Sequence, residues 1–428
     1  MTKKHFKGAF AATFISGMLI AMASCSDYEE QANDAAPPTE TEAHRISAEQ
    51  AIQNALDFVG QYGTTTRTDV GGLIVSDVKA ISVNKGDTRS ISNDEINLDS
   101  LFYVVNFDND RGFVLAASDD RETPVYAYVE DGKFEDDDTP NNGYDAFVNS
   151  LIEAETIRRI DDRKRLTIED DPYNGGGSNS SNSSNMKPDK FEVMLPLLNT
   201  EWGQEDYKPW CPGPYTGCVP TAIAQICSYL RYPENISWTT DKGFTWTYSL
   251  DWDGIIQACW SGSGNIYDPD LKKQVAHLMC YWGAMFNAKY ESDGTSVDGE
   301  YAINKMRELG YNATERVDYN ATNVMNDLKK GNRIVFMEGS GRYYHIWFFK
   351  RKYVDGHAWV VDGYIHSINN NQEALYLHCN WGWKGRRNGY FLSNALNAEE
   401  LPYYDNNANP MTRSENFRYK LKTSTICK

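Results

Sequence analysis

The chain has 428 residues and a formal net charge of −18, from 60 acidic and 42 basic side chains. This length is typical of two or three domains, at about 100–200 residues per domain. The acidic balance argues against a nucleic-acid partner, because phosphate backbones bind to basic surfaces.

The first 24 residues are typical of an export signal. Three lysines precede an apolar run over 9–23, which is too short and too rich in small residues to be a convincing membrane span. Small residues directly before Cys25 resemble a bacterial lipobox, so we predict cleavage there and acylation of Cys25. The alternative is an ordinary signal peptide cut nearby, with Cys25 uninvolved. The acidic segment 26–30 resembles the surface-export signal of some Gram-negative lipoproteins, which predicts a location at the outer membrane or cell surface.

A small α+β unit is expected over 46–172, after a disordered acidic tether over 25–45. Ser47 and Gln50 form a capping-box pattern at the start of an amphipathic helix. Two β-rich runs flank a turn at 108–112 and predict a hairpin. The strands and second helix expected in this unit are 101–107, 113–117, 125–129 and 144–154.

The composition changes between the two halves of the chain. All 11 tryptophans lie at or after Trp202. Between the halves, the segment 173–189 is rich in Ser, Asn and Gly, which predicts a flexible linker. Because exposed polar linkers are cut readily by proteases, we expect a cleavage between about Arg159 and Lys190.

The segment 190–428 predicts a second domain in which helices come first and strands follow. This order favours a helical lobe and an antiparallel β lobe with a cleft between them, so the fold class is α+β. The expected helices are 221–230, 272–281, 299–309 and 322–329. The expected strands are 333–337, 345–349, 359–364, 374–379 and 389–392.

Cys218 is the candidate nucleophile. It stands at the start of an apolar helix, and Pro220 fixes that start, since proline is tolerated only in a first turn. The oriented N–H groups of a helix start favour the thiolate, which is the reactive form. The alternative is a buried structural thiol, which is our interpretation of Cys227 in the same helix.

His357 is the candidate general base. It follows Cys218 by roughly 140 residues, within the interval of about 130–150 residues that is typical of a papain-type layout. Gly356 before it and the strand after it would hold the imidazole in place. His345 also precedes an apolar strand and is the rival candidate, whereas His378 is expected to pack or to support.

Three further residues are candidates for supporting roles. Asn380 could accept the second imidazole N–H and orient the ring, and Trp381 could screen that hydrogen bond from water. Gln204 could donate to an oxyanion together with the Cys218 backbone N–H. The alternatives are a turn asparagine and a surface glutamine.

Four motifs in chain order resemble the streptopain family of cysteine peptidases. They are W-G-Q, C-P-x(4)-G-C-x-x-T-A-x-A-Q-I, G-H-A-W-V-V-D-G-Y and N-W-G-W, and they span Leu195 to about Phe391. The resemblance implies a papain-like fold, endopeptidase activity on proteins and synthesis as a zymogen whose inhibitory propeptide is 46–172. It also implies a preference for a bulky apolar residue two positions before the cut. By motif, the site residues are Cys218, His357, Gln204, Asn380 and Trp381.

The chain departs from related sequences at two places. Val219-Pro220 stands where relatives commonly have Val-Ala, which a first helical turn tolerates. Asn380-Trp381 lacks the residue that papain has between Asn and Trp. Which residue fills the asparagine role is therefore open.

Partners and cofactors follow from the same interpretation. Besides Cys25 and Cys218, six cysteines remain, and the sequence leaves their pairing open. No C-x-x-C pair exists, so no zinc site is predicted, and the chemistry requires no cofactor or metal. The expected partners are protein or peptide substrates, the propeptide and, through the lipid, a membrane. The alternative functions are a catalytically silent surface lipoprotein that binds peptides or host proteins in the same cleft, and a transglutaminase-like acyltransferase.

Overall fold

The structure is a computed structural model of the whole chain. The export signal, Cys25, the tether as far as residue 43 and the linker as far as residue 188 lie outside the described residues. Among the residues that are described, no helix is both long and apolar enough to cross a membrane. The described residues are 44–66, 70, 72–82, 99–134, 144, 147–148, 151–152, 154–156, 158–159, 189–205, 207, 211–240, 242–259, 266–292, 294–345, 351–369, 372–396 and 421–428, and the side chains of 340–345, 351–355, 369 and 372 are also left out.

The first half of the chain folds as the sequence predicts, with one added strand. Helix α2 (Ala48–Thr66) begins after Ser47, whose hydroxyl accepts a 3.2 Å hydrogen bond from the Gln50 N–H. The expected hairpin is present as β2 and β3, and the described residues between 144 and 159 are helical. The strand β1 was not predicted, because its polar and apolar residues do not alternate cleanly. The strands are β1 (Val75–Ile81), β2 (Phe102–Phe107), β3 (Phe113–Ala117) and β4 (Val125–Val129).

The second half contains the four expected helices, with shifted ends, and further elements that the sequence did not predict. The helices are α4 (Cys218–Leu230), α5 (Trp252–Cys259), α6 (Pro269–Met285), α7 (Gly299–Glu308), α8 (Ala321–Lys329) and α9 (Ser393–Leu396). The longer strands are β5 (Lys190–Met194), β12 (Ile334–His345), β13 (Arg351–Asn369), β14 (Gln372–Asn380), β15 (Gly389–Leu392) and β16 (Lys422–Cys427). The shorter strands are β6 (Asn235–Thr239), β7 (Thr245–Ser249), β8 (Lys289–Glu291), β9 (Gly294–Ser296), β10 (Asn312–Ala313) and β11 (Val317–Asp318).

One expected strand needs correction. Residues 345–349 were expected to form a strand, but His345 is the last residue of β12, and 346–350 lie outside the described residues. β12 and β13 pair as a long antiparallel hairpin from Val335↔Val361 to His345↔Arg351. His345 therefore ends a strand and does not begin one.

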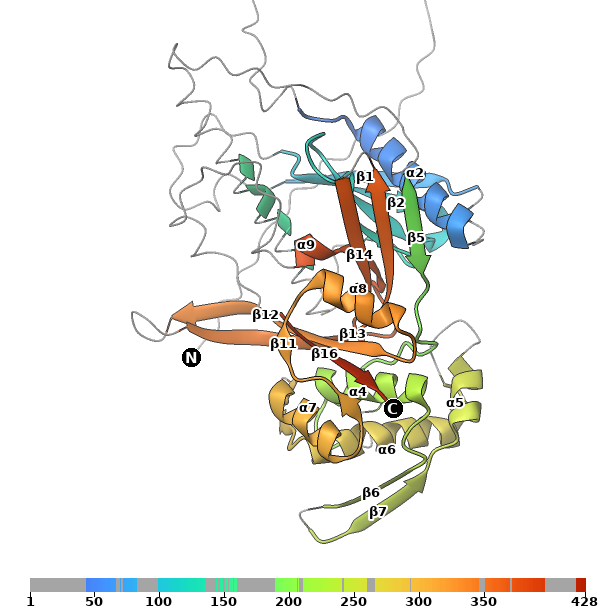
Figure 1. Cartoon of the computed structure of the whole chain (residues 1–428), viewed down its shortest axis with the longest axis vertical. Coiled ribbons are helices and arrows are strands. Elements are labelled where there is room, and N and C mark those ends of the chain that lie inside the picture. The colour runs from blue at the N-terminus through green and yellow to red at the C-terminus, as the bar shows by residue number, and fades with distance from the viewer. Residues whose placement is uncertain are drawn as a thin grey trace, which may run out of the picture.

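A single antiparallel sheet runs through both halves of the chain (Figure 1). The described strands follow the order β1-β2-β3-β4-β15-β14-β13-β12-β16-β10, with β5 beside β13 and β11 beside β16. The two halves meet where β4 pairs with β15, in the register Tyr390↔Tyr128. The first half thus extends the sheet of the second half by strand addition.

Two hydrophobic cores lie on either side of this sheet. One joins α2 and the strands of the first half to residues of β13–β15, including Trp359 and Phe391. The other packs α4, α5, α6 and α7 against Ala358 and Val360 of β13. Because period-2 alternation sends adjacent residues to opposite faces, β13 contributes Trp359 to one core and Val360 to the other.

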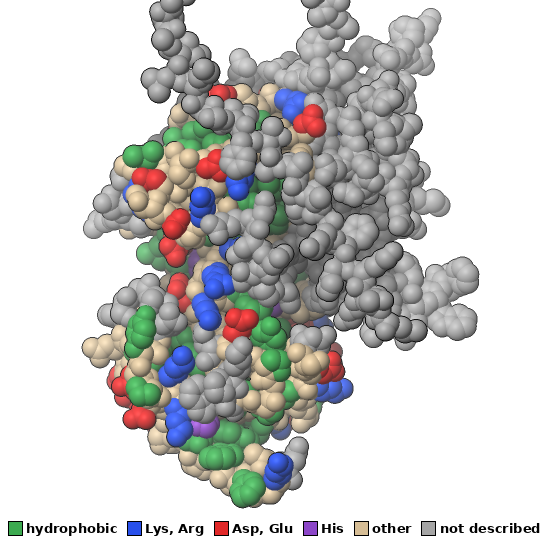
Figure 2. All heavy atoms as spheres, turned by 180° about the vertical axis from the view of Figure 1, so that it is seen from behind, with side chains coloured by type: hydrophobic (Ala, Val, Ile, Leu, Met, Phe, Trp, Pro, Cys, Tyr) green, Lys and Arg blue, Asp and Glu red, His purple; other side chains and the backbone are tan. Residues whose placement is uncertain are grey.

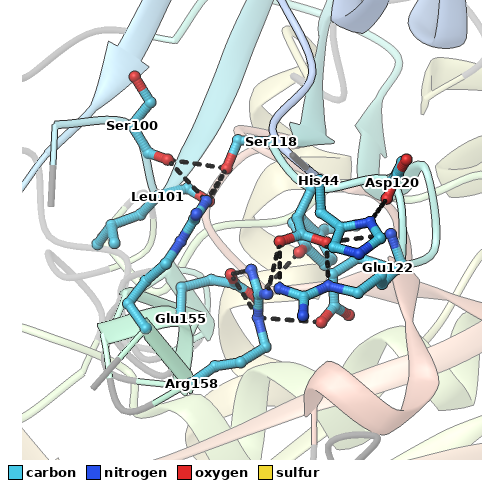
Figure 3. A network of polar contacts seen from close by, with 12 residues as sticks. His44, Ser100, Leu101, Ser118, Asp120, Glu122, Glu155 and Arg158 are labelled. Carbon is cyan, nitrogen blue, oxygen red and sulfur yellow. Dashed lines mark hydrogen bonds and ion pairs between the residues drawn. The ribbon is translucent and has the colours of Figure 1, made fainter. Parts of the chain in front are cut away.

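Arg158 centres an ion-pair network that holds the first half together (Figure 3). Its guanidinium lies 2.9 Å from Asp119, 3.0 Å from Glu122 and 2.5 Å from Glu155. Burial and the charge of Glu155 raise the pKa of Glu122, whereas the charge of Arg158 lowers it. The network ties the end of the last helix of this half to the turn before β4.

The hairpin β6–β7 projects from the far end of the second half (Figure 1). Its inner side covers α6, where Tyr248 stacks on His277 with ring centroids 3.8 Å apart. Phe244 and Trp246 are largely exposed, and Figure 2 shows hydrophobic side chains at this end of the molecule. The alternation of Ser or Thr with aromatic residues over 235–249 is the signal that would have predicted this hairpin.

Candidate active site

Cys218 is the first residue of α4, as the position of Pro220 predicts. Gly217 before it has φ 96°, a conformation that favours glycine, and a β-carbon there would lie 2.9 Å from the Thr295 side chain. The Thr295 hydroxyl donates a 2.7 Å hydrogen bond to the Tyr215 carbonyl. The chain that enters the helix is therefore packed closely against β9.

A disulfide between Cys211 and Cys280 fastens the same entering segment to α6. The sequence had left this pairing open. Among the described residues Cys218, Cys227, Cys259, Cys379 and Cys427 are free thiols. The segment that presents Cys218 thus has a covalent tie in addition to its packing.

The surroundings of Cys218 raise the pKa of its thiol above the ordinary value. Burial raises its pKa, and backbone groups of Ala358 and Val219 lower it without cancelling the effect of burial. The charge of Glu338 raises the pKa further. The backbone groups at the helix start lower the pKa of this thiol, as the sequence predicts, but loss of solvation acts more strongly in the opposite direction.

His357 lies on β13 and is buried. The backbone of the next residue, Ala358, is one of the groups that lower the pKa of the Cys218 thiol. The Nε2 of His357 lies 2.8 Å from the Trp381 carbonyl oxygen. A carbonyl only accepts, so Nε2 carries the proton and Nδ1 of the neutral ring carries the lone pair. Nδ1 is buried and has no hydrogen-bond partner among the described residues. Burial lowers the pKa of His357 to about 4, although the Trp381 hydrogen bond acts in the opposite direction.

Two indole rings lie nearly parallel to the imidazole. The Trp359 ring is 6.1 Å from it at 15°, and the Trp383 ring is 6.4 Å from it at 21°. Both indoles are buried. They restrict rotation of the ring and exclude water from it.

Asn380 does not occupy the position that the sequence suggested. Its Oδ1 accepts from Gln225 Nε2 at 3.1 Å and from the Gly382 N–H at 3.2 Å, and its Nδ2 donates to the Thr200 carbonyl at 2.9 Å. The acceptor for the imidazole is instead the backbone of Trp381, the following residue.

Gln204 is buried beside the segment that enters α4. Its backbone carbonyl accepts a 2.9 Å hydrogen bond from the Thr216 N–H, which places it near the nucleophile. No hydrogen bond of its side-chain amide is found among the described residues, and its role as oxyanion donor stays a prediction. The side chain of the rival His345 lies outside the described residues.

His378 has its own partners on β14. Its Nδ1 lies 2.6 Å from Asp362, and its Nε2 lies 3.7 Å from Glu130 at the end of β4. Burial lowers its pKa, but the carboxylates of Asp362, Glu130 and Glu201 outweigh this effect and raise it. His378 thus supports the junction of the two halves, in agreement with its expected role.

Comparison with known proteins assigns both halves of the chain. Residues 202–391 match the Peptidase C10 family, and residues 43–154 match the Spi protease inhibitor family. The catalytic half of the chain is a cysteine-type peptidase, and it is similar to the Peptidase C10 family. Its fold is the mixed α+β, papain-like fold, preceded by a propeptide that corresponds to the inhibitor match.

Several relatives of this peptidase are known. Streptopain of Streptococcus pyogenes is 24% identical over 397 residues, covering 82% of this chain and 86% of its own. Thiol protease/hemagglutinin PrtT of Porphyromonas gingivalis is 26% identical over 324 residues, covering 71% of this chain and 35% of its own. A solved fragment of prointerpain A from Prevotella intermedia is 21% identical with a TM-score of 0.47, covering 79% of this chain and 96% of its own.

Sequence reasoning missed two residues of the candidate site. Trp383 was quoted only as part of the motif N-W-G-W, yet its ring lies along the imidazole. Gln225, in the helix motif, was passed over because a glutamine in an apolar helix carries no chemical signal by itself. Its position on the buried face of α4 was the available clue.

Proposed function

We propose that this chain is an exported cysteine endopeptidase made as a zymogen, in which Cys218 is the nucleophile and His357 the general base. One observation carries the proposal: the hydrogen bond from His357 Nε2 to the Trp381 carbonyl leaves the lone pair on Nδ1. That nitrogen has no partner among the described residues, and the Cys218 thiol contacts the backbone of the next residue, Ala358. A thiol nucleophile needs a nearby base with a free lone pair, and these observations support His357 in that role.

The proposed reaction begins when Nδ1 of His357 removes the thiol proton of Cys218. The thiolate attacks the peptide carbonyl, and the backbone N–H of Cys218 and the amide of Gln204 stabilise the oxyanion. His357 then protonates the departing amine, leaving an acyl-enzyme. Finally His357 takes a proton from water, whose oxygen attacks the thioester and releases the carboxylic acid and the free thiol.

The propeptide is proposed to act on the loop that orients the base. β14 ends at Asn380 and β15 begins at Gly389, so the loop between them carries Trp381. The propeptide strand β4 pairs with β15 in the register Gly389↔Val129, directly beside this loop. The two parts also share buried contacts, such as the Phe147 and Phe391 rings at 4.9 Å. Such contacts support a propeptide that holds the loop, and through it His357, in a latent arrangement.

Activation is proposed to follow cleavage between the two anchored ends of the connecting segment. On one side, Arg159 is buried and donates to the Ser118 hydroxyl at 2.9 Å. On the other, Lys190 begins β5, which pairs with β13. The expected product is a catalytic chain beginning between these residues, identified by mass spectrometry of the active enzyme. Active enzyme that retains an intact 46–190 segment would contradict this step.

Anchoring through Cys25 is proposed from the lipobox pattern. The variant Cys25→Ala is expected to leave the membrane fraction and to lose incorporation of a labelled fatty acid. Cleavage in the linker would release the catalytic half from the lipid unless the propeptide stays bound. An unchanged membrane fraction for Cys25→Ala would favour an ordinary signal peptide.

The peptidase proposal is tested by thiol labelling of the matured enzyme. An active-site-directed thiol reagent is expected to label Cys218 faster than any other cysteine, and Cys218→Ala is expected to abolish cleavage of a protein substrate. Cys227→Ala is the matched control, since Cys227 is buried in the same helix. Slow labelling of Cys218 together with unchanged cleavage by Cys218→Ala would favour the silent peptide-binding alternative. Amine incorporation that exceeds hydrolysis would favour the acyltransferase.

A further inference from the structure

Gln225 is a fully buried amide about two turns along α4 from Cys218. Its Oε1 accepts hydrogen bonds from the Trp202 N–H at 3.0 Å and from the Thr200 hydroxyl at 3.4 Å. Its Nε2 donates to Asn380 Oδ1 at 3.1 Å. The side chain therefore bonds at the same time to the segment before Gln204 and to the end of β14.

Asn380 passes this constraint to the base. Its Oδ1 accepts hydrogen bonds from Gln225 and from the Gly382 N–H. These bonds hold the chain on both sides of Trp381, which lies between Asn380 and Gly382. The Trp381 carbonyl is the group that accepts from His357 Nε2. Movement of the Asn380 amide would thus move the acceptor that fixes the tautomer and the direction of the imidazole.

Asn380 is also connected, through Thr200, to the segment that leads to the proposed nucleophile. The Asn380 Nδ2 donates to the Thr200 carbonyl at 2.9 Å, which closes a ring of hydrogen bonds with Gln225. From there the chain runs to Gln204, whose carbonyl accepts from the Thr216 N–H just before Cys218. The three members of the ring and the attached Trp202 are almost completely excluded from water: Thr200, Gln225, Asn380 and Trp202.

We propose that Gln225 is a positioning residue, which sets His357 relative to Cys218 through Asn380 and the Trp381 carbonyl. The inference rests on the proposed roles of Cys218 and His357. The site needs one side chain that both accepts and donates, because the Trp202 N–H and the Asn380 Oδ1 are both buried. A primary amide meets this need, whereas an ionised carboxylate lacks the donor and a thioether lacks both strong groups.

The first test replaces Gln225 by methionine, which has a similar volume. Misplacement of reacting groups by about 1 Å costs on the order of 10²-fold in rate, so we expect Gln225→Met to lower kcat by roughly 10–100-fold with little change in KM. The control is Cys227→Ala, a buried change in the same helix with no link to Asn380, which is expected to keep kcat. Variants that mature slowly are processed with a trace of wild-type enzyme, which is removed before assay.

The second test uses Gln225→Glu and a pH profile. When protonated, a glutamic acid donates through its O–H to Asn380 and accepts from the Trp202 N–H, as the amide does. When ionised, it loses the donor and repels Asn380 Oδ1. We therefore expect Gln225→Glu to approach wild-type kcat at the acidic end and to lose activity as the carboxyl ionises, which moves the alkaline limb of the profile to lower pH. Gln225→Met is expected to be impaired at every pH.

Two results would overturn the inference. One is a Gln225→Glu profile that coincides with the wild-type profile, a result that stands even where Gln225→Met fails to fold. The other is a loss of kcat in Gln225→Met no larger than in Cys227→Ala at equal thermal stability. Failure of the proposed peptidase function looks different, because the wild-type enzyme would then have no activity that Cys218→Ala removes.

Discussion

The Arg158 network of the propeptide and the Cys218–His357 site of the catalytic half both bury ionisable groups, but they satisfy these groups differently. Around Arg158, three carboxylates lie within 3.0 Å of one guanidinium. Around His357, one ring nitrogen has a carbonyl partner and the other has none among the described residues. A buried charge that has its partners stabilises the fold, whereas a buried base without one is available for a proton transfer.

The largest effect is expected from His357→Asn, which removes the base and keeps a polar side chain of smaller size. Loss of a general base lowers kcat/KM by roughly 10²–10⁴-fold. Initial rates on a protein substrate measure this, with His366→Gln as the control, because His366 pairs with Glu373 on the sheet and not with the site. Equal losses in the two variants would show that the effect is not specific to the position of His357.

In the propeptide, Arg158→Met removes the common partner of several buried carboxylates. We expect a loss of about 3–5 kcal/mol in the free energy of unfolding of the propeptide. Denaturant unfolding of full-length protein in the Cys218→Ala background, which prevents self-cleavage, measures the loss. Arg121→Met is the control, since Arg121 is more exposed and a smaller loss is expected. If both variants lose the same amount, the Arg158 network is not a stabilising unit.

In the catalytic half, the disulfide between Cys211 and Cys280 holds the segment before Cys218. The double variant Cys211→Ala, Cys280→Ala is expected to lower the free energy of unfolding by about 2–4 kcal/mol, because the bond closes a long loop. The same loss should appear in the wild-type chain under reducing conditions. Cys259→Ala, which removes a free thiol, controls for the change of a buried cysteine. A double variant as stable as this control would show that the disulfide does not hold the segment before Cys218.

The smallest effect concerns the contact between the halves, where Glu130 of the propeptide faces His378. Because Asp362, Glu130 and Glu201 raise the pKa of His378 in spite of burial, its charge stabilises the junction below its ordinary pKa, and this contribution is lost as pH rises through the raised value. Glu130→Gln should make the loss of unfolding free energy between low and high pH smaller by about 1 kcal/mol. Denaturant unfolding of the full-length Cys218→Ala protein between pH 5 and 9 measures this difference. An unchanged pH dependence would show that Glu130 does not interact with His378.

Prediction from the sequence succeeded where a local pattern has one structural outcome. Pro220 placed the start of α4 correctly, since proline is tolerated only in a first turn. The hairpin β2–β3 followed from two apolar runs around turn residues. The strand β1 was missed, because its polar and apolar residues do not alternate cleanly.

The acceptor for the imidazole could not be predicted in the same way. Asn380 and Trp381 are adjacent, and either could have faced His357. The choice depends on hydrogen bonds from Gln225 and Gly382, which reach Asn380 from a distant helix and from the next turn. A contact of this kind has no local signal.

By itself, the sequence predicted the order of the two halves and pointed to Cys218 and His357 as the candidate nucleophile and base, because helix starts, turns and motif spacing are local properties of the chain. Only the tertiary structure decided which group accepts the hydrogen bond of the His357 ring, that burial raises the pKa of the Cys218 thiol, and that β4 joins the catalytic sheet at β15. These features arise from solvation and from contacts between distant segments, which exist only when the chain is folded.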